Sequence, residues 1–161
     1  MGATGSSAVV ERLAGLGLML PEPIPAVGKY QPVVVHGDVA YTSGLMAVTG
    51  PPLQIAYPGR VGDDIGIDDA KQSARGALLS TLAALQAGLG DLGRIGRFLH
   101  VRGYVCATPD FEKVHHVVGA ANALVVELFG DGEPAGRTAI GVAALPERAS
   151  VILECTVAVR S

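Results

Sequence analysis

The sequence predicts an α/β domain of mixed α+β type, a two-layer structure in which long helices cover one face of a mixed β-sheet. Apolar residues repeat with helical spacing in two long segments, and strand-like runs lie before, between and after them. The expected order is α-ββ-α-β-α-ββ, with no internal repeat and no break in composition. The 161 residues are therefore expected to form one domain, 1–161. Two long helices can cover only one face of a sheet, so the other face is expected to need a partner subunit.

The first third of the chain is expected to contain a short helix, an extended connection and a strand–turn–strand unit. Residues 1–23 contain the helical segment AVVERLAGL and then a proline-rich run, which favours an extended conformation. In QPVVVHGDVAYTSG (31–44), two apolar runs flank a tight turn at His36-Gly37-Asp38. Residues 49–66 contain so many glycines and prolines that they predict an irregular loop.

The first long helix is predicted to be capped by Asp68 or Asp69 and to run to about Ala87. Its leucines follow spacings of four, three and four residues and form one stripe: Leu78, Leu82, Leu85 and Leu89. The next segment, GLGDLG (88–93), matches the GxGxxG pattern of dinucleotide-binding loops. Such a loop follows a strand and precedes a helix. Here a helix comes first, so the glycines are interpreted as a helix end and a turn.

The second half of the chain is expected to contain strands and a second long helix. A strand covers FLHVRGYVC (98–106). Thr108-Pro109-Asp110 combines a capping residue, a first-turn proline and an acid, which predicts a helix from there to Gly130. The apolar seam of this helix comprises Phe111, Val114, Val118, Ala121, Val125 and Leu128. Two strands, 137–144 and 150–159, are expected to finish the chain.

Charge and cysteine content exclude several classes of partner. The net charge is −3 and no basic patch is visible, so nucleic acid is not expected as the main partner. Cys106 and Cys155 form no CxxC pair, which indicates a reduced, cytoplasmic protein without a disulfide or zinc site. Cys106 is expected to be a buried structural thiol. No uncharged run reaches the ~18 apolar residues that span a bilayer, so no membrane is expected.

The histidine pair of the second helix does not predict a metal site. His115 and His116 are adjacent, so their side chains are expected to point in different directions. Neither has a ligand residue four positions further along the helix, and adjacent positions cannot both face one ion. No metal is therefore expected.

Arg137 stands at the head of a neutral run, RTAIGVAA. In a strand, Thr138, Ile140 and Val142 would share one face, and Arg137 would share the other with small residues: Ala139, Gly141 and Ala143. This pattern leaves room beside a guanidinium. It is compatible with a binding site for a small anion, because the planar fork of arginine fits a carboxylate at two oxygens. It is equally compatible with the close approach of another backbone.

The run GRTAIGVAALPERASVILE resembles the closing signature of the RidA family, also called the YjgF/YER057c/UK114 or L-PSP family. That signature is an arginine with a small hydroxyl residue, an alternating strand, Leu-Pro, and a strand that ends in glutamate. AVGKY (26–30), YTSG (41–44) and TPDFEKVHHV (108–117) resemble other family segments in the same order. The resemblance covers about residues 24–159. The N-terminal helix and VVGAANALVVELFG resemble a long-chain branch of the family.

The resemblance implies a chorismate-mutase-like fold and a homotrimer with clefts between subunits, in which the last strand inserts into the sheet. It also implies hydrolysis of reactive 2-imino acids to 2-oxo acids and ammonia, without a cofactor. Arg137 matches the arginine that holds the substrate carboxylate. Gly44 and Ala139 match positions whose backbone lies against the ligand, and Tyr30 matches a tyrosine from the neighbouring subunit.

One position departs from the family pattern. The water-positioning glutamate of the family falls on Ile152, which would line the cleft but cannot accept a proton. Glu154 corresponds to a second acid two residues later and becomes the candidate catalytic acid beside Arg137. Residues two apart on a strand share a face, so both would face the same side.

Three functions follow from these residues. The first is hydrolysis of 2-imino acids by a deaminase of the 2-iminobutanoate/2-iminopropanoate type. The second is binding of a small carboxylate, such as a 2-imino or 2-oxo acid, without catalysis. The third is the endoribonuclease activity of the family's older name, against which the acidic balance argues.

Overall fold

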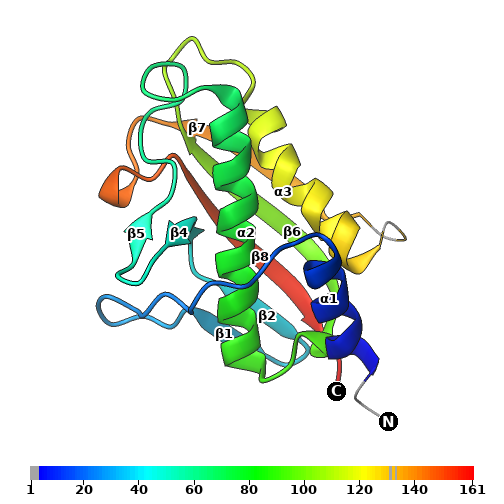
Figure 1. Ribbon diagram of the computed structural model, residues 1–161. Coiled ribbons are helices and arrows are strands. Elements are labelled where there is room, and N and C mark those ends of the chain that lie inside the picture. The colour runs from blue at the N-terminus through cyan, green and yellow to red at the C-terminus, as the bar shows by residue number, and fades with distance from the viewer. Residues whose placement is uncertain (1–3, 131, 133) are drawn as a thin grey trace.

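The protein is built around a six-stranded mixed sheet covered by helices (Figure 1). The computed structural model describes residues 4–130, 132 and 134–161. The sheet contains β1 (Val33–His36), β2 (Val39–Thr42), β3 (Leu45–Met46), β6 (Ile95–Cys106), β7 (Gly136–Val142) and β8 (Val151–Val159). A separate pair consists of β4 (Val48–Thr49) and β5 (Gln54–Ile55). The helices are α1 (Thr4–Gly15), α2 (Ile67–Leu89) and α3 (Val114–Phe129), with 3-10 turns at Leu92–Arg94 and Pro146–Arg148.

The last strand lies inside the sheet, as the resemblance implies. The strand order is β1-β2-β8-β6-β7, and β3 also pairs with β8. β8 is antiparallel to both β2 and β6, whereas β7 is parallel to β6. Parallel neighbours need a crossover connection, which α3 supplies. β7 and β8 are thus consecutive along the chain but lie on either side of β6.

The two long helices lie side by side on one face of the sheet and begin at the same end of it (Figure 1). The leucine stripe predicted for α2 is buried along its whole length. On α3, Val118 and Ala121 are fully buried. A Cβ placed on Gly103 of β6 would lie 2.4 Å from Val118 Cγ2. This glycine therefore allows α3 to pack directly on the sheet.

The second long helix begins later than the sequence predicts. α3 starts at Val114, with Lys113 at its N-cap, whereas Thr108–Asp110 belongs to a turn. The Thr108 N–H donates to the Val61 carbonyl at 3.0 Å, and the Thr108 carbonyl accepts from the Phe111 N–H at 3.0 Å. The backbone of Thr108 is therefore committed to a bridge with the loop before α2.

Two other boundaries differ from expectation. α2 is capped by Gly66, not by Asp68 or Asp69, which lie in its first turn where the positive end of the helix favours carboxylates. The predicted loop 49–66 contains β5, and β4 ends at its first residue. The GxGxxG segment does end a helix, because Gly90 adopts φ 81° as the C-cap of α2.

The opposite face of the sheet carries no helix within the described part of the chain (Figure 1). Large apolar side chains are exposed on it, among them Val34, Tyr41 and Ile140. Val34 and Tyr41 are direct partners across β1 and β2. Among the described helices, none has the length and apolarity needed to cross a bilayer.

Candidate functional site

Arg137 lies on the edge strand β7 and faces the helices. It is in register with Val101 of β6, whose side chain is fully buried beneath the helices. Paired residues of neighbouring strands point to the same face. Accordingly, Arg137 Nη1 is 3.2 Å from the position that a Cβ on Gly119 of α3 would occupy. The guanidinium is exposed and makes no hydrogen bond or ion pair with any residue that the structure describes.

The small residues that follow Arg137 differ in their burial beside α3. Ala139 packs against the core, and a Cβ on Gly141 would lie 3.5 Å from Val114 Cγ1. Close packing of α3 therefore accounts for Ala139, whereas Gly141 and Ala143 are exposed and a Cβ on Gly141 would make only an ordinary contact. The guanidinium of Arg137 lies at the rim of that packing and retains its donors for a ligand.

The surroundings of Arg137 are positively charged. The pKa of His116 is lowered by the neighbouring charge of His115 first, then by burial, and then by the charges of Lys71, Lys113 and Arg137. An anion bound at Arg137 would meet a positive potential from these groups.

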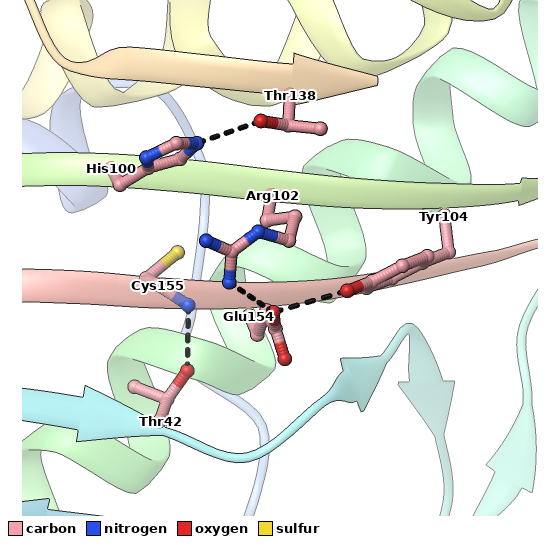
Figure 2. A network of polar contacts seen from close by, with 7 residues as sticks. All are labelled: Thr42, His100, Arg102, Tyr104, Thr138, Glu154 and Cys155. Carbon is pink, nitrogen blue, oxygen red and sulfur yellow. Dashed lines mark hydrogen bonds and ion pairs between the residues drawn. The ribbon is translucent and has the colours of Figure 1, made fainter. Parts of the chain in front are cut away.

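The open face of the sheet carries a polar network centred on Glu154 (Figure 2). Arg102 Nη1 donates to Glu154 Oε1, and the Tyr104 hydroxyl donates to the same oxygen at 3.1 Å. The pKa of Arg102 is raised by its hydrogen bond and charge interaction with Glu154. The pKa of Tyr104 is raised by burial and then by its bond to Glu154. Glu154 Oε2 receives no hydrogen bond from the described residues, so it can accept one from water.

Ile152 lies on the same face as Glu154, as the spacing predicts. It pairs with Tyr104 on one side and with Met46 on the other, and it is 9 % exposed. A Cβ on Gly44 would lie 2.8 Å from Ile152 Cγ2, so the two predicted site residues are in direct contact. Tyr30 lies before β1 and is 47 % exposed.

The predicted site residues fall into two separate groups within one chain. Arg137 and Ala139 face the helices, whereas Gly44, Ile152 and Glu154 belong to the open face. The register makes this plain, because Glu154 pairs with Arg102 while Arg137 pairs with the adjacent Val101. A site that uses both Arg137 and Glu154 must therefore combine residues from two chains.

Sequence reasoning overlooked three polar residues of β6: His100, Arg102 and Tyr104. His100 Nε2 and Thr138 Oγ1 are 2.9 Å apart, next to the Glu154 network (Figure 2). A signal was present, because polar residues alternate with buried Val101, Gly103 and Val105 through this strand. This alternation indicates a strand with one polar face.

The expectations on cysteine and histidine have mixed outcomes. Cys106 and Cys155 are both free and buried, as predicted for Cys106, and burial raises the pKa of Cys155 to about 12. The expectation that His115 and His116 point in different directions is wrong, since their ring centroids are 4.3 Å apart. Both are exposed on the first turn of α3, where the side chains can rotate toward each other. Within the described ranges, no group of three or more metal-ligating residues could hold an ion.

The central C-terminal strand and the two helices on one face define a chorismate-mutase-like α/β protein. Residues 10–155 match the family described as "YjgF/chorismate mutase-like, putative endoribonuclease". The chain therefore belongs to the RidA/YjgF family.

Relatives of similar length match this chain almost from end to end. Protein TCP17 of Trypanosoma cruzi is 29 % identical over 161 residues, covering 98 % of each chain. The crystal structure of Atu1372 from Agrobacterium tumefaciens, a protein of unknown function, has a TM-score of 0.90 at 30 % identity and covers 99 % of this chain and 98 % of its own. The YjgF gene product of E. coli has a TM-score of 0.60 at 21 % identity and covers 87 % and 94 %.

Proposed function

We propose that this protein binds the carboxylate of a small 2-imino or 2-oxo acid through Arg137, in a cleft between subunits, and hydrolyses the imine. The observation that carries the proposal is the exposed guanidinium of Arg137. It has no partner among the described residues and lies within a group of other cations. A bidentate contact with a carboxylate would use the free donors of Arg137 and offset the repulsion between Arg137 and the neighbouring basic residues.

The chemistry requires a water molecule beside the bound imine. In hydrolysis, the water oxygen adds to C2, its protons pass to the imine nitrogen, and ammonia leaves to give the 2-oxo acid. Arg137 would fix the carboxylate, and Glu154 of a neighbouring subunit would orient the water through Oε2. Gly44 and Tyr30 would line the same cleft. No cofactor takes part in this scheme.

The same scheme requires a homo-oligomer, for which we propose a trimer. Arg137 and Glu154 lie on opposite faces of one sheet, so one chain cannot present both to one ligand. The uncovered face also exposes Val34, Tyr41 and Ile140, which subunit contact would bury. Light scattering at micromolar concentration should therefore give three chains per particle. A monomer would remove both the assembly and the shared site.

Ile152 supports a second candidate, in which the cleft binds a small carboxylate without catalysis. Its side chain is nearly buried against Gly44 and provides no proton acceptor where the family has a glutamate. A semicarbazide-trapping assay with enzymatically generated 2-iminobutanoate separates the two candidates. Weak but measurable acceleration of 2-oxobutanoate release supports hydrolysis, and none at all supports binding alone.

Endoribonuclease activity has less support in this chain. The net charge is −3 and the lysines number three, whereas RNA binding depends on phosphate contacts from many cations.

The free, buried thiols of Cys106 and Cys155 support a reducing, cytoplasmic location.

A further inference from the structure

A group of basic side chains that includes Arg137 lies around His116 on the helix-covered face. This cationic patch consists of Lys71 on α2, Lys113, His115 and His116 at the start of α3, and Arg137 on β7. Three separate elements contribute to it. A single carboxylate held at Arg137 would use one of these cations and leave the rest available.

The backbone geometry brings His116 close to Arg137. His116 and Gly119 are three residues apart on α3 and therefore lie on the same face of the helix, about 5–6 Å apart between Cβ positions. Arg137 Nη1 lies 3.2 Å from the Cβ position of Gly119. The guanidinium thus rests within one helical turn of the His116 side chain. The ring of His115 lies against that of His116, at 4.3 Å between centroids.

Lys71 adds a charge from the neighbouring helix. α2 and α3 lie side by side and begin at the same end of the sheet (Figure 1), and Lys71 is the fifth residue of α2. The charge of Lys71 reaches His116, where it contributes to the lowered pKa of the imidazole. Lys71 has a weak contact of 3.9 Å with Asp68, whose side chain is 95 % exposed, so its charge is barely neutralised.

We propose that the cationic patch binds a second acidic group of the ligand, so that the preferred ligands are 2-imino or 2-oxo acids with an acidic side chain. This inference rests on the carboxylate clamp at Arg137 proposed above. Arg137 holds the carboxylate next to the reacting carbon, and His116 and Lys71 hold the distal one. The spacing of one helical turn between Arg137 and His116 fits the separation of the two acidic groups in a short diacid.

Calorimetric titration with two probes tests the inference at about pH 5.5, below the usual pKa of histidine, because the pKa of His116 is lowered and its charge is needed for the contact. 2-Oxobutanoate carries one carboxylate, and 2-oxoglutarate carries two. The parent protein should bind 2-oxoglutarate about tenfold more tightly, the effect expected of one additional charge-assisted contact. The double variant Lys71→Met, His116→Gln should lose this preference, so that it binds 2-oxoglutarate and 2-oxobutanoate with about equal affinity.

The control variant is Arg75→Met, which removes a cation one turn further along α2. Arg75 is paired with Glu127 at 3.3 Å and lies outside the patch. It should therefore leave the preference intact.

The outcomes separate this inference from the proposed function. Equal affinity of the parent for both probes, or a preference that survives the double variant, overturns the second acid site and leaves the clamp standing. An equal loss of preference in Arg75→Met would show a general charge effect and would also overturn it. If the parent binds neither probe, both the clamp and the second site are wrong.

Discussion

A methyl group added at Gly103 should disturb the contact between α3 and the sheet. In Gly103→Ala, the new Cβ would lie 2.4 Å and 2.8 Å from the two methyl groups of Val118 and 3.1 Å from Leu153 Cδ2. Both neighbours are fully buried, and a valine on a helix is restricted to one main rotamer. An ordinary contact needs at least 3.4 Å, so α3 must retreat by about 1 Å. Overpacking of this kind costs about 3 kcal/mol, at the upper end of the usual range.

Urea denaturation followed by circular dichroism measures this cost. With a slope of about 2 kcal/mol per molar urea, the midpoint should fall by about 1.5 M at equal protein concentration. Gly15→Ala is the matched control, because Gly15 ends α1 and a Cβ there meets nothing within 4 Å. Its free energy of unfolding should change by less than about 0.5 kcal/mol. A Gly103→Ala midpoint equal to that of the parent would refute the close packing of α3 on β6.

Three further predictions concern the site. Glu154→Gln should lower imine turnover on the order of 100-fold and leave 2-oxobutanoate affinity nearly unchanged. The control variant Glu147→Gln should have no effect. Unaltered turnover in Glu154→Gln would mean that another residue positions the water. If the site has instead lost its base, Ile152→Glu should raise turnover by about 100-fold in the same assay and Ile152→Gln should not. Unchanged turnover in Ile152→Glu would show that the site has no use for a carboxylate there. Arg137→Met should raise the pKa of His116 in an NMR titration, because it removes one of the cations that lower it; His115, Lys71 and Lys113 still act on the imidazole. An unchanged pKa would place Arg137 away from α3.

The helices could be predicted because their pattern is local. The leucine stripe of α2 and most of the predicted seam of α3 are buried, although each helix buries further residues beside the pattern, among them Val117 and Leu124 of α3. The start of α3 could not be predicted in this way. Thr108 is followed by a proline and an acid, which favour the start of a helix. Its backbone N–H, however, donates to the carbonyl of Val61, a residue far away in the sequence.

The arrangement of the site depends on strand order, which local patterns do not contain. The alternation of side chains along a strand predicts that Arg137 shares a face with Ala139, and that Ile152 shares a face with Glu154. Both predictions are confirmed in the structure. Which face each pair occupies follows from the register of both strands with β6. The family resemblance implied the insertion of β8, but the opposite orientation of the two pairs emerged only from the assembled sheet.

The carboxylate clamp at Arg137 is tested most directly by calorimetric titration of the parent and of Arg137→Lys with 2-oxobutanoate. Lysine retains the positive charge but lacks the planar fork that holds both carboxylate oxygens. Arg137 makes no hydrogen bond or ion pair with the described residues that its loss would break, so the circular dichroism spectrum and Tm should stay unchanged. Affinity should fall by at least about tenfold, with nearly all binding lost. Equal affinity of the two proteins would show that Arg137 is an ordinary surface charge and would contradict the proposed site.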